Sequence, residues 1–377
     1  MPFCYAPWTN IDIDSQGEIT PCCKFNILAY QESPRNIRTH TIEDYTKSAT
    51  LNQVKQEFVA NKWPAGCERC QIEEENNIKS KRQLDQLRWN EHYSNYDISS
   101  GKLLTASVAF GNTCNLTCIT CGPNPSSRWQ AEAKKIYNID IAPNHFYKND
   151  FADNFMAHAR DLIHIDIPGG EPLLGGVPVQ HQILQRYIES GQSKNLSLHY
   201  TTNGTIFPGL EWWDLWAHFK EVEMQLSIDG VGDRYEYIRF PANWELTNAN
   251  VTKYLAHAKS NSNFKLSVST TVSAFNIAYL NELLDWCAEV GLPKPWLGRV
   301  HMPRHFRPSV WPAEAKQHII SRLKNGRHLD TRTWAMMMAA TDDSEFFSEF
   351  VSRTQQHDQY RKLDFSSTFP EMAKYFT

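Results

Sequence analysis

The stretch GNTCNLTCITCGPN, residues 111–124, places Cys114, Cys118 and Cys121 within eight residues, directly after the β-rich run LLTASVAF. The spacing C-x3-C-x2-C lets one short loop offer three thiolates to one inorganic cluster. Because a [4Fe-4S] cluster normally takes four cysteines, such a loop leaves one iron open to another ligand. A zinc ion completed by a distant His or Cys is the alternative for this loop taken alone.

From about residue 99 the sequence around this loop alternates short β-rich runs with helical stretches. The runs are LLTASVAF, LIHIDIP, LSLHYTT, EMQLSID, FKLSVSTTV and PWLGRVHM. Alternation of strand and helix predicts an α/β fold with a parallel sheet, because parallel strands need a crossover connection. Six such units favour a partial (β/α)6 barrel of TIM type, with an open doubly wound sheet as the alternative. In either fold ligands bind at the carboxyl ends of the strands, where the three cysteines lie.

Composition limits the possible partners. The chain has 377 residues, a net charge of -4 and 41% hydrophobic residues, which gives no electrostatic reason to expect nucleic acid or an anionic membrane as partner. The N-terminal MPFCYAPWTNIDID lacks a basic region followed by an apolar run, and no run of eighteen apolar residues occurs. We therefore expect a cytoplasmic protein with no membrane partner.

The cysteine content points to metal binding. Nine cysteines, an odd number, occur in a chain without an export signal, and eight of them precede residue 122. Clustered cysteines in a reducing compartment are metal ligands more often than disulfides. Cys287, in the helical stretch LNELLDWCAEVG, stands apart and is predicted to be a small core residue.

A second cysteine pattern lies near the N-terminus. Cys4 is followed by Gly17 and then by Cys22, and the later stretch GCERC supplies Cys67 and Cys70. The alternating stretch NIDIDSQGEITPCC predicts a hairpin whose turn, at Gly17, brings Cys4 and Cys22 together. Four thiolates would close a cluster, and a zinc ribbon is the alternative.

Over residues 103 to 303 the motifs resemble those of the radical S-adenosylmethionine (radical SAM) enzymes, whose hallmark is the C-x3-C-x2-C loop after the first barrel strand. PGGEPLL is similar to the family's GGEP motif, and TTNGT and LSIDG look like the third and fourth strand ends. Many members carry an aromatic residue where this sequence has Thr120. The resemblance implies an open [4Fe-4S] cluster and S-adenosylmethionine (SAM) as cofactors. It implies SAM contacts at Gly169, Gly170, Glu171, Pro172, Asn203, Ser227 and Asp229.

The residue types of the GGEP motif suit contacts with SAM. Paired glycines permit close backbone approach, and Glu171 supplies an acceptor for an ammonium group. The resemblance of LSIDG implies that Ser227 or Asp229 reaches the ribose hydroxyls of SAM.

The N-terminal pattern C-x12-G-x4-C with a later C-x2-C resembles the twitch domain, the shortened relative of the SPASM domain. This resemblance implies a second, auxiliary [4Fe-4S] cluster. In most relatives the module follows the barrel, whereas here it precedes it. The implied ligands are Cys4, Cys22, Cys67 and Cys70, with Cys23 as the alternative to Cys22.

The family resemblance implies an activity. The reduced open cluster would cleave SAM to a 5'-deoxyadenosyl radical, which abstracts hydrogen from a peptide or protein side chain or from a small metabolite. An electron donor such as flavodoxin or ferredoxin would be a partner, and the auxiliary cluster would assist substrate binding or oxidation. A non-catalytic iron-sulfur scaffold and a zinc-binding interaction protein are the alternatives.

Polar residues near the expected barrel mouth are candidates for the chemistry. They are His199, Arg239, Arg299 and His301, and the last two would share one strand face by alternation. Arg299 and His301 could hold a carboxylate or move a proton, or these residues could be a SAM contact and a structural polar pair.

The sequence divides into three predicted regions: residues 1–98 form the auxiliary-cluster domain, 99–310 the barrel and 311–377 a helical extension. We expect the extension to pack against the open side of the barrel, with a substrate-covering flap as the alternative. The predicted packing residues are Met336, Met337, Met338, Phe346, Phe347 and Phe350.

Overall fold

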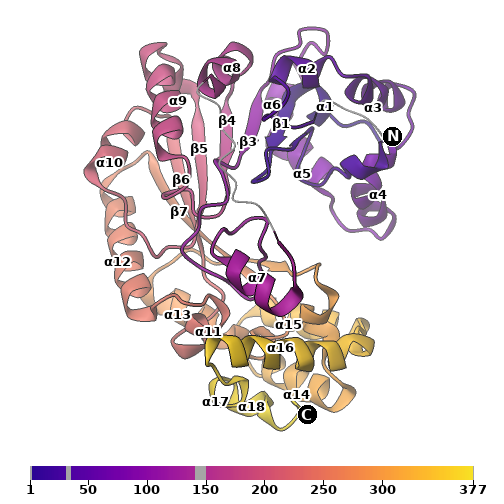
Figure 1. The fold of residues 1–377 in the computed structure, drawn as a ribbon, viewed down its shortest axis with the longest axis vertical. Helices are drawn as coiled ribbons and strands as arrows, with labels where there is room; N and C mark the ends of the chain where they lie inside the picture. The colour runs from indigo at the N-terminus through magenta and orange to yellow at the C-terminus, as the bar shows by residue number, and fades with distance from the viewer. Residues whose placement is uncertain (1, 31–34, 141–149, 377) are drawn as a thin grey trace. The chain divides into compact units, whose positions relative to one another are not determined.

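The computed structural model describes residues 2–30, 35–140 and 150–376 (Figure 1). Its strands are β1 (Asn10–Ile13), β2 (Ile19–Thr20), β3 (Thr105–Val108), β4 (His164–Ile167), β5 (Ser197–Thr202), β6 (Glu221–Ser227), β7 (Phe264–Val272) and β8 (Trp296–Arg299). The hydrogen-bonded order is β2-β1-β3-β4-β5-β6-β7-β8. The β1–β2 pair is antiparallel, whereas β1–β3, β3–β4, β4–β5 and β7–β8 are parallel. The predicted α/β fold with a mostly parallel sheet is confirmed, and each of the six predicted runs contains one strand, β3 to β8.

Helices connect and flank the strands. The α-helices are α1 (Ala6–Thr9), α2 (Ile42–Thr46), α3 (Ala49–Val59), α4 (Glu68–Glu75), α5 (Lys81–Arg88), α6 (Asn90–Tyr93), α7 (Trp129–Tyr137), α8 (Phe151–His158), α9 (Val177–Glu189), α10 (Leu210–Trp216), α11 (Asp233–Ile238), α12 (Trp244–Ser260), α13 (Leu280–Val290), α14 (Ala313–Lys324), α15 (Leu329–Ala340), α16 (Phe347–Arg361), α17 (Phe365–Thr368) and α18 (Pro370–Ala373). No described helix has both the length and the apolar character needed to cross a membrane.

The chain forms two compact units. The first contains Met1–Thr113, Pro143–Tyr200 and Leu210–Val222, and the second contains Cys114–Ala142, Thr201–Gly209 and Glu223–Thr377. They are described separately below.

In the first unit, the predicted N-terminal hairpin is confirmed as β1 and β2. Gly17 has a φ of 80°, which favours glycine, and the Asp14 carboxylate accepts bonds from the backbone N–H groups of Gln16 (2.8 Å) and Glu18 (2.9 Å). These local bonds fix the turn.

The hairpin also extends the main sheet, which the sequence did not reveal. β1 pairs in parallel with β3, so that Asn10 lies opposite Thr105. Ile11 and Ile13 are buried on one face of β1, whereas Asp12 lies on the other. The cysteine-rich N-terminal segment is thus built onto the edge of the sheet.

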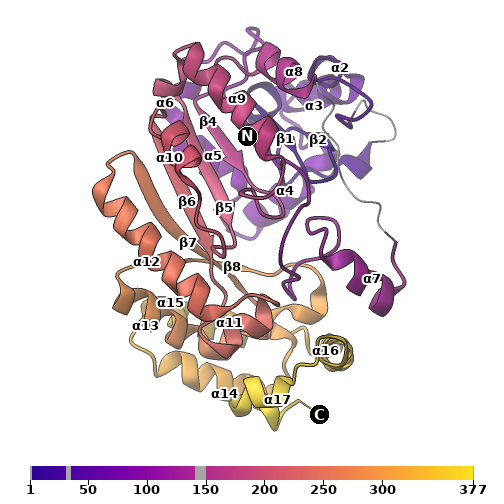
Figure 2. The same cartoon turned by 60° about the vertical axis from the view of Figure 1, so that its left-hand side comes forward.

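In the second unit, the C-terminal helices lie together (Figure 2). Their buried aliphatic and aromatic side chains belong to one hydrophobic cluster. Phe350 is fully buried there and Met338 is 2% exposed, as predicted. Met336 is 63% exposed, so its predicted packing is wrong, because it faces away from the core on α15. Cys287 is buried on α13, and its predicted core role is confirmed.

Candidate functional site

The three cysteines of the loop after β3 lie close together in the second unit. Burial raises the pKa of the Cys118 thiol to about 12; the Arg239 guanidinium opposes this shift, whereas the neighbouring Cys121 and Cys114 thiols add to it. A metal that binds such a thiol displaces its proton, because the ligand is the thiolate. We refer to residues 114–121 as the three-cysteine loop.

A short backbone pairing fixes the three-cysteine loop beside α11. The N–H of Thr117 donates to the carbonyl of Phe240 (2.6 Å), and the N–H of Ile119 donates to the carbonyl of Ile238 (2.8 Å). Arg239 lies between these two acceptors, and its Nη1 is 3.9 Å from the Cys118 sulfur. The Arg239 guanidinium therefore lies beside the Cys118 thiol as a cationic N–H donor.

A buried carboxylate holds Arg239 in place. Its Nη2 lies 2.8 Å from Asp229 Oδ2, and Asp229 Oδ1 accepts the backbone N–H of Thr271 (2.7 Å). Burial disfavours the guanidinium charge, but the Asp229 carboxylate and the Cys118 thiolate outweigh burial and raise the pKa of Arg239. Arg239, predicted as a catalytic candidate, is thus a fixed cation at the three-cysteine loop.

The TTNGT turn is tied to the same loop. Asn203 is 6% exposed, and its Nδ2 donates to Asn115 Oδ1 (2.8 Å) and lies 4.0 Å from the Cys114 sulfur. Asn115 in turn donates to Thr205 Oγ1 (2.8 Å). Ser227 ends β6 and is half-buried. The second unit thus brings together the predicted residues Asn203, Asp229 and Arg239 around the loop.

The other two catalytic candidates lie at the end of β8. Arg299 is the last residue of that strand, and burial together with the nearby Arg307 guanidinium lowers its pKa. His301 lies two residues beyond the strand and is exposed, and its carbonyl accepts from Arg307 Nε (3.0 Å). The predicted shared strand face is therefore wrong, because β8 ends before His301.

In the first unit, the GGEP turn approaches the segment just before the three-cysteine loop. A Cβ on Gly170 would lie 2.4 Å from the Thr113 carbonyl oxygen and 2.7 Å from that of Asn112. The N–H of Glu171 donates to the Thr113 carbonyl (2.8 Å). Gly170 therefore has no room for a side chain at this backbone contact.

Hydrogen bonds within the first unit fix the rest of this turn. Glu171 is fully buried, and its Oε1 accepts the N–H of Leu173 (3.1 Å). The Pro172 carbonyl accepts from Gln180 Nε2 (2.7 Å), and Gly169 has a φ of 153°. The SAM contacts expected at these positions stay a prediction.

Four cysteines of the first unit line one hollow. They are Cys4, Cys22, Cys67 and Cys70, and the hollow holds about 370 Å³ of empty space, open solvent included. Cys23 is exposed and does not line the hollow, which favours Cys22 over Cys23 as the ligand. Burial raises the pKa of Cys4 to about 12.

The walls of this hollow suit a cluster with four thiolates. Phe25, Phe58 and Trp63 supply an apolar lining. The charged lining residues are the cations Lys24, Lys81 and Arg82 and the anion Asp85, which lies 2.7 Å from Lys81 Nζ. Sulfur donors with nearby cations fit an iron-sulfur centre, whose net charge is negative. Among the described residues, no group of three or more His, Cys, Asp or Glu side chains is arranged to hold a single metal ion.

A row of polar residues crosses the strands of the first unit in register. Of its members, only His199 was singled out from the sequence. Its members Asp12, Ser107, Asp166 and His199 lie opposite one another on β1, β3, β4 and β5. His199 Nδ1 lies 2.9 Å from Asp166 Oδ1, and His164 Nε2 lies 3.1 Å from the same oxygen. The repeated pattern apolar-Asp-apolar in NIDI and HIDI was the available signal.

The two carboxylates of this row have opposite pKa shifts. Burial opposes the Asp166 charge, but hydrogen bonds from His164 and His199 outweigh it and lower the Asp166 pKa. Burial raises the pKa of Asp12 to about 6, although a hydrogen bond from Ser107 opposes that shift. The row therefore combines a fixed anion with a carboxyl group that titrates near neutrality.

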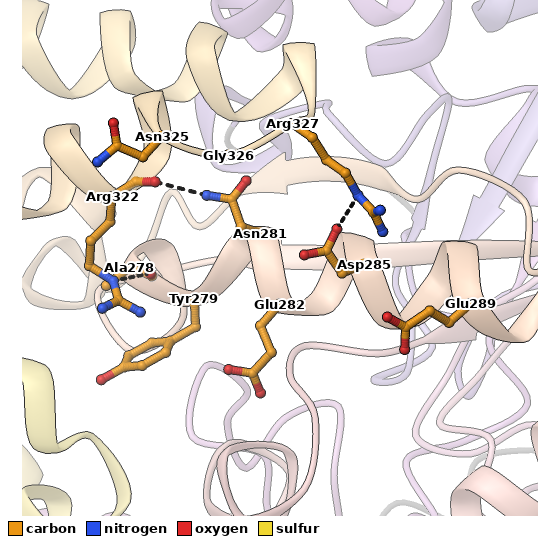
Figure 3. Close-up of a pocket in the computed structure, with 10 residues that line it drawn as sticks. All are labelled: Ala278, Tyr279, Asn281, Glu282, Asp285, Glu289, Arg322, Asn325, Gly326 and Arg327. Carbon is orange, nitrogen blue, oxygen red and sulfur yellow. Dashed lines mark hydrogen bonds and ion pairs between the residues drawn. The ribbon is translucent and has the colours of Figure 1, made fainter.

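A surface groove elsewhere in the second unit is lined by α13 and the residues that follow α14 (Figure 3). Within the groove, Arg327 Nε lies 2.6 Å from Asp285 Oδ1. Asn281 donates to the Arg322 carbonyl (2.9 Å), and Arg322 Nε donates to the Ala278 carbonyl (3.0 Å). None of the predicted site residues lines this groove.

A comparison with known protein families covers the cysteine-rich segment of the first unit. Residues 4–71 match the SPASM family model, an iron-sulfur cluster-binding domain, so the chain carries a SPASM iron-sulfur domain at its N-terminus. No curated protein matches the sequence.

Several solved structures of radical SAM enzymes resemble the chain. Native anSMEcpe with bound AdoMet is 18% identical over 52% of each chain, with a TM-score of 0.39. SuiB of Streptococcus suis bound to S-adenosylmethionine is 13% identical over 77% of this chain and 62% of that chain, with a TM-score of 0.37. TYW1 with a lysine-pyruvate adduct bound is 12% identical over 59% of this chain and 72% of that one, with a TM-score of 0.35. The chain spans about half the length of the first of these.

Proposed function

We propose that the chain is a radical SAM enzyme with one open and one auxiliary [4Fe-4S] cluster. The observation that carries this proposal is the arrangement of Cys114, Cys118 and Cys121 on one loop, with Arg239 and Asn203 donating toward two of the sulfurs. Three thiolates leave one iron of such a cluster open. The succession β3 to β8 supports a partial (β/α)6 barrel as the scaffold.

The residues present fit these cofactors. The donor set of both sites is sulfur alone. Burial raises the pKa of Cys4 and of Cys118, so these two thiols would lose their protons on binding a metal. The SPASM match over residues 4–71 supports the auxiliary cluster, with Cys4, Cys22, Cys67 and Cys70 as its ligands. The shortened, twitch-like form of that domain is part of the proposal.

When bound and reduced, the open cluster supplies the electron that cleaves SAM and so starts hydrogen abstraction from the substrate. Arg239 would place positive charge against the Cys118 thiolate, which favours the reduced, more negative state of the site. Asn203 would hold Asn115, next to Cys114, in position. Gly169, Gly170, Glu171, Pro172, Ser227 and Asp229 keep their proposed SAM contacts, with Glu171 as acceptor for the SAM ammonium.

The substrate is proposed to be a peptide or protein side chain or a small metabolite. The Asp166–His199 pair on the polar row would hold a polar group of the substrate or accept its proton, since it combines a fixed anion with an imidazole. Arg299 and His301 remain candidates for the same role. A flavodoxin or ferredoxin would donate electrons in the cytoplasm. The auxiliary-cluster domain would span residues 1–98, the barrel 99–310 and the helical extension 311–377.

The test is metal content together with SAM cleavage. After purification without oxygen, the wild type should contain about eight iron per chain, and the triple variant with Ala at Cys114, Cys118 and Cys121 about four, since each cluster holds four. Reductive SAM cleavage should be lost in the triple variant. Cys287→Ala, at a buried core position, is the control and should keep both properties. A wild type that does not cleave SAM, or a triple variant that still does, would overturn the proposal.

A further inference from the structure

Three consecutive carbonyls of the three-cysteine loop each accept a hydrogen bond from a side chain outside the loop. The bonds join Leu116 O to Ser126 Oγ (2.7 Å), Thr117 O to Arg361 Nη2 (2.6 Å) and Cys118 O to Trp129 Nε1 (3.0 Å). Carbonyls with fixed donors cannot rotate freely, so these bonds fix the backbone that carries Cys118 and that joins Cys114 to Cys121.

One of the three donors comes from a distant part of the chain. Arg361 is the last residue of α16 and lies 244 residues after Thr117. Both residues belong to the second unit. Helices α7 and α16 lie side by side, so the end of α16 reaches the loop (Figure 1).

A buried carboxylate on α7 orients Arg361. Glu132 is 2% exposed and Arg361 is 6% exposed. Arg361 Nε lies 2.9 Å from Glu132 Oε1 and 3.2 Å from Oε2, which leaves Nη2 free to reach the Thr117 carbonyl. A buried ion pair of this kind is stable only where both charged groups have well-placed hydrogen-bond partners.

His357, one turn earlier on α16, completes the network. Its Nδ1 lies 2.5 Å from Glu132 Oε1, and its Nε2 lies 2.7 Å from the Tyr137 hydroxyl. Burial lowers the pKa of His357, although the hydrogen bond with Glu132 opposes this shift. When Nδ1 donates to Glu132, Nε2 of a neutral imidazole accepts from Tyr137. Glu132 Oε1 thus contacts both His357 and Arg361.

Two aromatic rings confine the guanidinium plane. The Arg361 Cζ lies 5.4 Å from the Trp129 ring centre and 5.3 Å from that of Phe240. Trp129 itself donates to the Cys118 carbonyl, and the carbonyl of Phe240 accepts from Thr117. A lysine would supply charge but neither the planar fork nor the stacking, so it would restore the position only in part.

We infer that Arg361 is a positioning residue for the open cluster, and that α16 supports the reaction centre through Glu132 and Arg361. The inference rests on the proposed function, because it assigns to these residues the placement of the cluster's thiolate ligands. Neither residue is expected to contact SAM or the substrate.

The experiment compares Arg361→Met, Arg361→Lys and the double variant Glu132→Gln/Arg361→Met with the wild type. The double variant removes both charges together, so that no unpaired ion is left buried and the fold is kept. Arg332→Met, at an exposed position on α15, is the matched control. Each anaerobically purified holoprotein is reduced and its electron paramagnetic resonance spectrum is recorded with and without SAM, followed by SAM cleavage rates.

We expect the auxiliary-cluster signal to be unchanged in every variant. The SAM-dependent spectral change should be altered in Arg361→Met and in the double variant, and their cleavage rate should fall about 100-fold, the cost of a misplacement near 1 Å. Arg361→Lys should recover part of the rate, and Arg332→Met should match the wild type.

Two outcomes separate this inference from the proposed function. A wild type whose spectrum does not respond to SAM contradicts the proposed function itself. A wild type that responds, beside an Arg361→Met protein and a double variant with the same spectrum and rate, contradicts the positioning role alone.

Discussion

The two cysteine sites of this chain are built in opposite ways. The three-cysteine loop takes its sulfurs from eight neighbouring residues, 114–121, and its support from side chains as distant as Arg361. The four-cysteine hollow takes its sulfurs from positions spread between Cys4 and Cys70, and its walls from nearby residues of the same segment. One site has local ligands with long-range support, and the other has dispersed ligands with local support.

This difference matches the chemistry proposed for each site. The hollow supplies four thiolates and apolar walls such as Phe58 and Trp63, which leave no iron for another ligand. The loop supplies three thiolates beside polar donors, Arg239 and Asn203. A cluster with four thiolate ligands needs walls that enclose it. A cluster with three thiolate ligands also needs support that keeps its free iron oriented toward the next ligand.

The largest expected effect comes from a ligand of the hollow. Cys70→Ser should remove the auxiliary cluster, so that iron falls from about eight to about four per chain, since each cluster holds four. Cys23→Ser should leave iron unchanged, because Cys23 is exposed and does not line the hollow. Iron and sulfide analysis of both variants checks this. Loss of iron in Cys23→Ser would break the assignment of Cys22 as ligand.

A smaller effect is expected at the GGEP turn, which adjoins the segment leading into the loop. Gly170→Ala would place its Cβ 2.4 Å from the Thr113 carbonyl oxygen, a backbone atom that cannot move aside alone. We expect a loss of about 1–3 kcal/mol in the free energy of unfolding, as for other overpacked sites.

The matched control for this substitution is Gly122→Ala, where the added Cβ meets open space. Unfolding followed by tryptophan fluorescence compares the two variants. Equal stability of both would show that the close approach at Gly170 does not matter. A larger loss of iron from the loop than from the hollow in Gly170→Ala would sharpen the contrast between the two sites.

The sequence predicted what depends on neighbours along the chain. The C-x3-C-x2-C spacing, the hairpin at Gly17 and the six strands are local patterns, and the structure reproduces the hairpin and strands. The support of the loop could not be predicted, because Glu132 meets His357 across 225 residues and nothing in either stretch marks the partner. The pairing of β1 with β3 was missed for the same reason.

The register of the strands also places Asp12 opposite Ser107. The smallest expected effect concerns the titration of the Asp12 carboxyl group. The folded pKa of Asp12 is about 6, above its ordinary value near 3.9, because burial disfavours the charge. The folded state therefore binds the proton more tightly than the unfolded state, so Asp12 destabilises the protein increasingly as pH rises through this interval. Between pH 5 and 7.5 the loss amounts to about 1 kcal/mol, at 1.36 kcal/mol per pKa unit.

Asp12→Asn removes this titration while keeping a side chain that can bond to Ser107. Relative to the wild type, the variant should therefore gain about 1 kcal/mol in unfolding free energy between pH 5 and 7.5. Asp214→Asn, at an exposed position on α10, should show no such gain. A stability difference that is constant across this interval would mean that Asp12 is already charged at pH 5. The polar row would then contain two fixed anions, Asp12 and Asp166, which would favour a cationic substrate group there.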